Sequence, residues 1–257
     1  MFNDIVIGPI TIHMYGVMIA AGFLAALLMT LRRGKKRGYD EDLIWGIFFC
    51  AIIGGMLGTR ILYYIVEIPE ILKDPSILWD FKNGYVVYGG IIGGIFAGWL
   101  YCRIKKLKFL AYFDLMMPSI ALAQGFGRIG CFLAGCCYGK ETSGPLAVTF
   151  TSSDFAPNNI PLIPTQIYSS ILDFVHFLLL LYVAKHKKAD GQVAACYLIF
   201  YSIGRFIIEF FRGDIERGSV GSFSTSQFIS IFTAIAGIIV LFVATVNKKD
   251  SRNYHKK

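Results

Sequence analysis

Long apolar runs separated by short polar segments dominate the chain. Apolar runs of about 20 residues are long enough to cross a bilayer as helices. Their positions predict seven spans, near residues 12–31, 44–65, 87–102, 112–136, 166–184, 193–211 and 226–246. The pattern therefore predicts an all-α polytopic membrane protein. We expect a single integral membrane domain over residues 1–257, with small extracytoplasmic loops or a small head.

Composition supports this prediction. The chain has 257 residues, of which 55% are hydrophobic and only 16% charged, whereas a soluble domain carries about 25% charged residues. A net charge of +8 could suit nucleic acid, but the basic residues fall in short clusters between apolar runs, so no nucleic-acid partner is predicted. The six cysteines lack zinc-ligand spacing. They predict no metal site, disulfide scaffold or cofactor, and Cys136 and Cys137 are interpreted as small packing residues.

The basic clusters alternate with connections that contain few basic residues. They follow the first, third, fifth and last spans, in segments 32–37, 103–108, 185–188 and 248–257. Together they hold most of the 25 lysines and arginines. Because positive loops stay in the cytoplasm, these segments are predicted to be cytoplasmic. The N-terminus is then outside and the C-terminus inside.

One arginine, Arg128, lies in the middle of an apolar, glycine-rich run. A guanidinium stays charged at any workable pH. Placing it in a bilayer costs at least about 2.5 to 3.5 kcal/mol, so it requires an anionic partner or a wet cavity. Arg128 therefore predicts an anion site inside the membrane.

Other polar residues are predicted at the same outer-leaflet depth. They are His13, Tyr15, Arg60, Tyr88, Gln124, Gln166, Arg205, Glu209 and Arg212. The spacing of the last three predicts one helix face. Deeper or toward the cytoplasm lie Asp114, interpreted as a cap of its own helix, and Asp173, interpreted as a packing partner.

Several members of this set have structural alternatives. Arg205 and Glu209 could form a structural ion pair, and Arg212 could be an interfacial anchor. His13 and Tyr15 could be belt residues at the headgroup level. Taken together, however, three or four arginines against one carboxylate leave a surplus of positive charge. The planar guanidinium suits phosphate, so we expect an anionic lipid of the outer leaflet as the substrate.

Glycines repeat every four residues in two spans. Gly54 and Gly58 form one stripe, and Gly90, Gly94 and Gly98 form another. Such small-residue stripes let two membrane helices pack closely. The two stripes predict close helix packing rather than a ligand site.

Five short motifs occur in a fixed order along the chain. They are His13-Met14-Tyr15-Gly16, Tyr88-Gly89-Gly90, Gly127-Arg128-Ile129-Gly130-Cys131-Phe132, Pro164-Thr165-Gln166-Ile167-Tyr168 and Gly204-Arg205-Phe206-Ile207-Ile208-Glu209-Phe210-Phe211-Arg212. With seven spans and an outside N-terminus, the ordered set resembles the bacterial prolipoprotein diacylglyceryl transferases. The resemblance covers nearly the whole chain.

The resemblance implies an enzyme that moves diacylglyceryl from phosphatidylglycerol to the lipobox cysteine of a prolipoprotein signal peptide. The product is a thioether, glycerol-1-phosphate leaves, and the enzyme lies in the bacterial cytoplasmic membrane with its site toward the outer leaflet. Catalytic roles are implied for Arg128, Arg205 and Tyr88. Substrate-binding roles are implied for Arg128, Arg205, Tyr15, His13, Gln166, Glu209, Arg212, Arg60 and Gln124.

The signature also departs from the family pattern. The family usually has asparagine at the position of Cys131 and an acidic residue at that of Cys136, and many members have histidine at the position of Tyr88. Tyrosine, with an unperturbed pKa near 10, is a poor base at neutral pH, so the base stays unassigned. The alternatives are a related phosphatidylglycerol-dependent transferase with another acceptor, an anionic-lipid transporter and a passive scaffold.

Overall fold

Seven long apolar helices make up most of the structure. The computed structural model describes residues 4–7, 10–80, 84–214 and 218–254, so the predicted basic residues Lys256 and Lys257 lie outside the described part. The long helices are α1 (Met14–Lys36), α2 (Glu41–Val66), α4 (Val87–Ile104), α5 (Phe109–Ala134), α6 (Thr165–His186), α7 (Gln192–Glu209) and α8 (Thr225–Tyr254). Each contains a segment long and apolar enough to cross a membrane. The predicted helical fold and its spans are confirmed; the sides of the membrane stay a prediction.

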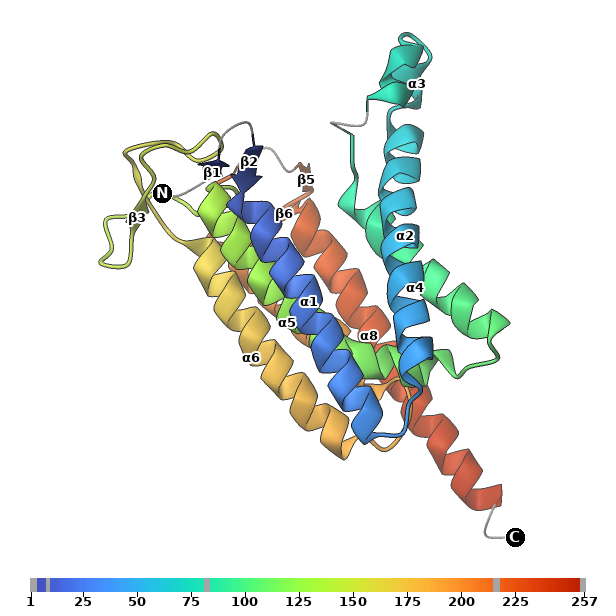
Figure 1. The fold of residues 1–257 in the computed structure, drawn as a ribbon. Helices are drawn as coiled ribbons and strands as arrows, with labels where there is room; N and C mark the ends of the chain where they lie inside the picture. Colours follow the sequence, from blue (N-terminus) through green and yellow to red (C-terminus); the bar gives the residue numbers. More distant parts are fainter. Residues whose placement is uncertain (1–3, 8–9, 81–83, 215–217, 255–257) are drawn as a thin grey trace. The chain divides into compact units, whose positions relative to one another are not determined.

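The chain divides into two compact units. The first unit comprises Met1–Thr30 and Phe113–Lys257, and the second comprises Leu31–Tyr112. Figure 1 shows the first unit as a bundle of long helices, with the short strands β1 and β2 at the start of α1. The single domain stays a prediction.

Helices of the first unit pack through small residues and an apolar core. On α1, a Cβ added to Gly22 would lie 3.0 Å from the Ala123 carbonyl oxygen of α5. The Ser170 hydroxyl of α6 donates to the Gly125 carbonyl of α5 at 2.9 Å. The buried core between α5, α6 and α7 consists of Met117, Ala121, Phe177, Leu180, Ala184, Val193 and Ala194.

The start of α7 is fixed by a carboxylate from another helix. Asp114 of α5 is fully buried and accepts hydrogen bonds from the backbone N–H groups of Gly191 and Ala194, both at 2.9 Å. It also accepts from Lys187 Nζ at 2.9 Å. The N-cap of α7, Gly191, has no capping side chain of its own. Asp114 therefore caps α7, and the interpretation that it caps its own helix is wrong.

Short strands occur at the ends of the helices, where none was predicted. They pair as β1 (Asp4–Ile7) with β2 (Ile10–His13), β3 (Val148–Thr149) with β4 (Pro161–Leu162), and β5 (Ser219–Val220) with β6 (Phe223–Ser224). All three pairs are antiparallel. His13 pairs with Asp4 in the first hairpin, so it precedes α1 instead of opening the first span.

Residues 135–164 form the predicted small head between α5 and α6. Phe150 and Leu162 are buried in its core, against which Phe132 and Tyr138 pack. The Phe132 and Phe150 rings meet edge to face with centroids 6.1 Å apart. These aromatic contacts attach the head to the end of α5.

The second unit is built on a close contact between α2 and α4. It also contains α3 (Ile68–Ile71) and the 3-10 helix η1 (Pro75–Trp79). A Cβ on Gly58 would lie 2.2 Å from the Gly89 carbonyl oxygen, and one on Gly54 would lie 2.7 Å from that of Gly93. The predicted stripe on α2 is confirmed, whereas the closest stripe on α4 contains Gly89 and Gly93, one position before Gly90 and Gly94.

Candidate active site

A cavity of about 270 Å³ opens between α5, α6 and α7 of the first unit. One face of α6 lines it through Ser169, Leu172, Asp173, His176 and Leu179, and one face of α7 through Phe200, Tyr201, Gly204, Arg205 and Ile208. Both sets follow the three- and four-residue spacing of a helix face. Arg128 lines the same cavity from α5. The structure thus brings together the two arginines that the sequence singled out most strongly.

Arg128 has hydrogen-bond donors available for a ligand. Its Nε lies 4.0 Å from Asp173 Oδ2, and its side chain is 24% exposed. That separation is too long for a hydrogen bond, and Arg128 has no other acceptor within the described ranges. A guanidinium presents five N–H donors in a planar fork. These N–H donors are therefore available to bind an anion in the cavity.

Arg205 is held more tightly. Its Nη2 lies 2.8 Å from Glu209 Oε2, one helical turn later, and donates to Ser226 Oγ of α8 at 2.7 Å. Both side chains of the ion pair are largely buried. The structural ion pair considered from the sequence is therefore present, and it orients Arg205 along the cavity wall.

Arg212 does not share the helix face of Arg205 and Glu209. Helix α7 ends at Glu209, and Arg212 instead forms an isolated β-bridge with Gly139. Its guanidinium binds Asp214 through two hydrogen bonds, one of them 2.8 Å long. The predicted common face is wrong because the chain leaves the helix before Arg212.

The expected surplus of positive charge is also wrong for the first unit. Arg128 faces Asp173, Arg205 pairs with Glu209, and Arg212 pairs with Asp214. The sequence interpretation set aside Asp173 and did not consider Asp214. Arg128 differs from the other two arginines because its carboxylate, Asp173, lies too far away for a hydrogen bond. The site does not hold an excess of cations.

The cavity contains four polar residues outside the predicted site. They are Ser169, Asp173, His176 and Tyr201. His176 is buried, its Nε2 has no hydrogen-bond partner in the described part of the chain, and its ring stacks on Tyr197 with centroids 5.0 Å apart. Tyr201 interacts electrostatically with Arg128 and Arg205. Their helical spacing along α6 and α7 could have revealed these residues from the sequence. Single polar residues are scattered through the apolar runs, however, so this spacing did not stand out.

Other predicted residues of the first unit lie around the cavity rather than in its wall. Tyr15 packs where a Cβ on Gly130 would meet its ring at 3.3 Å. Gln124 accepts from the Tyr197 hydroxyl at 2.9 Å. Gln166 is buried and donates from Nε2 to the Cys136 carbonyl at 2.8 Å. Gln166 thus positions the segment that follows α5.

Arg60 and Tyr88 belong to the second unit. Arg60 is buried; it donates to the Tyr64 hydroxyl at 2.8 Å and to the Gly84 carbonyl at 3.1 Å, and also binds the Asp80 carbonyl. These bonds fasten the segment after η1 onto α2. Tyr88 opens α4 and is 46% exposed. Substrate roles for both residues stay predictions.

Known proteins resemble this chain over nearly its full length. The family model for prolipoprotein diacylglyceryl transferase matches residues 4–243. A phosphatidylglycerol–prolipoprotein diacylglyceryl transferase of Clostridium tetani is 53% identical over 93% of this chain and 95% of its own. One from Clostridium perfringens, named as the second such transferase, is 48% identical over 96% and 97%. One from Clostridioides difficile is 34% identical over 94% of each.

These matches agree with the architecture. The seven apolar helices identify a multi-pass membrane protein, and the matched residues include the cavity between α5, α6 and α7. The chain belongs to the prolipoprotein diacylglyceryl transferase family.

Proposed function

We propose that the protein transfers the diacylglyceryl group of phosphatidylglycerol to the lipobox cysteine thiol of prolipoproteins, with the phosphate bound at Arg128. The observation that carries the placement is the cavity position of Arg128, whose donors lack a protein acceptor within the described residues. The names of the relatives support both substrates.

The reaction requires stabilisation of a phosphate leaving group. The acceptor sulfur attacks the glyceryl carbon of the lipid, a C–S bond forms, and the C–O bond to phosphate breaks. The leaving glycerol-1-phosphate receives that electron pair, and the thiol proton passes to a base or to the phosphate. A fixed guanidinium at the phosphate stabilises this developing charge. Arg128 would provide it directly, and Arg205, oriented by Glu209 at 2.8 Å, would assist.

The cavity also suits the apolar part of a lipid. Its arginines lie near the C-terminal ends of α5 and α7, beside the N-terminal half of α6. The remaining wall is largely aliphatic and aromatic, with Leu172, Val175, Leu179, Phe200, Ile203 and Ile207. A headgroup at the arginines would leave the acyl chains against this wall.

The positive-inside rule supports the orientation of the site. Basic clusters flank the opposite ends of the same helices, for example after α6, and such clusters stay cytoplasmic. We place the end of the cavity that contains Arg128 and Arg205 at the outer leaflet of the bacterial cytoplasmic membrane. His13, Tyr15, Gln124, Gln166 and Arg212 are retained as proposed substrate-site residues of the first unit, and Arg60 as one of the second unit.

A reconstituted assay tests the function. Purified protein in vesicles with phosphatidylglycerol should add one diacylglyceryl group to a lipobox peptide, detected by mass spectrometry. A peptide with serine for cysteine, and vesicles of phosphatidylethanolamine alone, should give no product. No product on the cysteine peptide, while the C. tetani relative modifies it in parallel, would contradict the proposal. Glycerol-1-phosphate release without peptide modification would indicate another acceptor.

Tyr88→Phe tests the proposed catalytic tyrosine. We expect transfer to fall by about 10²-fold or more, because the variant removes the only proton-transfer group of that side chain. Tyr85→Phe is the matched control, since Tyr85 is also exposed and precedes α4. Full activity of Tyr88→Phe would exclude the phenol as a catalytic group.

A further inference from the structure

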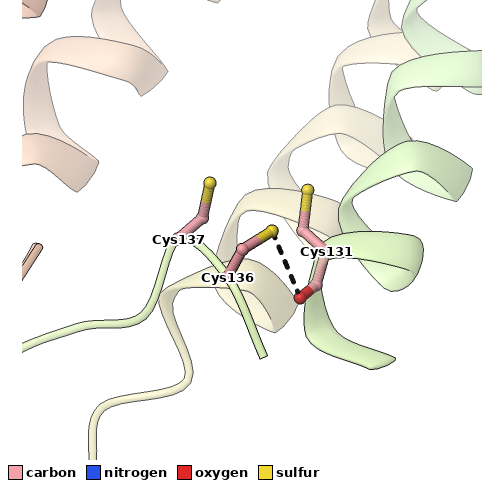
Figure 2. A group of neighbouring side chains, drawn as sticks. All are labelled: Cys131, Cys136 and Cys137. Carbon is pink, nitrogen blue, oxygen red and sulfur yellow. Dashed lines mark hydrogen bonds between the residues drawn. The ribbon is translucent and has the colours of Figure 1, made fainter. Parts of the chain in front are cut away.

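Three cysteine side chains converge where α5 ends. Cys131, Cys136 and Cys137 place their sulfur atoms within 4.8 Å of one another. Figure 2 shows Cys136 between the other two, with its thiol donating to the Cys131 carbonyl at 3.7 Å. All three are thiols in the structure and are neither fully buried nor exposed. The sequence interpretation as packing residues did not foresee this cluster.

The helix end creates the convergence. Gly135 adopts φ +77°; its N–H donates to the Phe132 carbonyl at 3.2 Å, and the Cys136 N–H donates to the Cys131 carbonyl at 3.1 Å. These two bonds make a Schellman motif, which folds residue 136 back beside residue 131. Cys137 is itself left-handed, with φ 63°, and such a conformation is uncommon for a non-glycine residue.

Neighbouring elements hold this segment in place. The carbonyls of Cys136 and Cys137 accept hydrogen bonds from Gln166 Nε2 and Thr165 Oγ1, both at 2.8 Å. The adjoining Gly139 N–H donates to the Ile163 carbonyl at 3.0 Å. The backbone that carries two of the three thiols is therefore fixed against the first turn of α6.

Two arginines lie next to the cluster. Arg212 hydrogen-bonds to the Cys137 thiol, and Arg128 interacts electrostatically with Cys131 and Cys137. Three thiolates around a divalent cation carry one net negative charge, and this charge would lie beside Arg128 and beside Arg212, which also binds Asp214.

We propose that Cys131, Cys136 and Cys137 form a binding site for one Zn²⁺ ion. Zinc–thiolate bonds of about 2.3 Å place tetrahedral sulfur ligands about 3.8 Å apart, so a contraction of about 1 Å at most would complete the site. Thiolates are soft ligands that select zinc over magnesium or calcium. Three protein ligands leave a fourth position for water or another small ligand. This site does not depend on the proposed transferase activity.

Metal analysis of the purified full-length protein tests the site. Reduced protein is incubated with Zn²⁺, freed of unbound metal, and measured by inductively coupled plasma mass spectrometry. We expect about one Zn²⁺ per chain, and at least about 100-fold weaker binding in Cys131→Ser, Cys136→Ser or Cys137→Ser. Cys50→Ser and Cys196→Ser, outside the cluster, should bind like the unmodified chain. Equal zinc in the cluster and control variants would overturn the proposal.

A second measurement avoids any dependence on how the variants fold. The unmodified chain is treated with N-ethylmaleimide with and without Zn²⁺, and the alkylated cysteines are identified by peptide mass spectrometry. Zinc should protect residues 131, 136 and 137 together and leave Cys50 and Cys196 unaffected. Unchanged labelling of all three, or a two-dalton mass loss that identifies a disulfide within the cluster, would contradict the zinc site.

Discussion

Arg128→Ala should lower diacylglyceryl transfer by about 10² to 10³-fold, the usual cost of removing one preorganised donor from developing charge. The loss should appear mainly in kcat, because the charge on phosphate grows as the C–O bond breaks. Arg128→Lys should recover only part of the activity, since an ammonium group keeps the charge but cannot form the planar fork. The rate of peptide modification in vesicles measures both effects.

A matched control separates the site from general loss of positive charge. Arg103 lies in the last turn of α4 and is exposed. Arg103→Ala removes the same type of side chain at another position, and this variant should keep at least half of the transferase activity. If Arg128→Ala keeps as much, the phosphate is not bound at this arginine.

Asp114→Ala should lower the free energy of unfolding by about 3 to 5 kcal/mol, more than any other substitution proposed for this protein. Removing one partner of a buried pair leaves the other charge uncompensated, and here the variant also uncaps α7. The half-buried Lys187 would keep only Asp190 as its carboxylate. Thermal unfolding in detergent should show a midpoint about 10 °C lower or more.

The control for this variant is Asp190→Ala. Asp190 is more exposed and binds the same lysine at 2.9 Å, so its loss should cost about 1 kcal/mol or less. Burial opposes the charge of Lys187, but the hydrogen bonds that it donates to Asp114 and Asp190 raise its pKa above the ordinary value. A raised lysine pKa stabilises the fold throughout neutral pH, and the contribution disappears only above that pKa. Equal midpoints for the two aspartate variants at pH 7 would disprove the capping role.

Hydropathy predicted the long helices well because each span must satisfy its backbone internally and bury apolar side chains in lipid. The same argument could not locate two-residue strands such as β3, or the hairpin that contains His13. Strands that short carry too few side chains for an alternating pattern to emerge. Most helix ends were therefore predictable to within three residues, whereas α1 and α8 continue five and eight residues beyond the predicted spans into polar sequence, and the segments between the helices were not predicted.

Within the site, the sequence indicated Arg128 and Arg205 correctly as neighbours of one cavity. It missed the partner of Arg128, because Asp173 lies 45 residues away on another helix and only packing brings them to 4.0 Å. It also misplaced Arg212, since helical spacing was extended beyond the point where α7 ends. Pair contacts between helices depend on rotation about each helix axis, which one sequence does not determine.

The cysteine cluster shows the same limit at the level of the backbone. Spacing of five residues between Cys131 and Cys136 does not suggest a common site on a straight helix. Two left-handed residues, Gly135 and Cys137, reverse the chain and bring the thiols together. Glycine at the end of an apolar run was a visible helix-stop signal, but the left-handed cysteine was not.

The cap that Asp114 places on α7 also constrains how the protein is made. Its partner Gly191 is 77 residues later in the chain, which a ribosome adding about 5 to 20 residues per second takes about 4 to 15 s to reach. During that interval the Asp114 carboxylate lacks both the lysine and the helix start that it binds in the finished protein. We therefore expect the N-terminal half of α5 to reach its final contacts only after α6 is complete and α7 has begun to form. These contacts favour a late docking of α5, α6 and α7 together over a helix-by-helix addition.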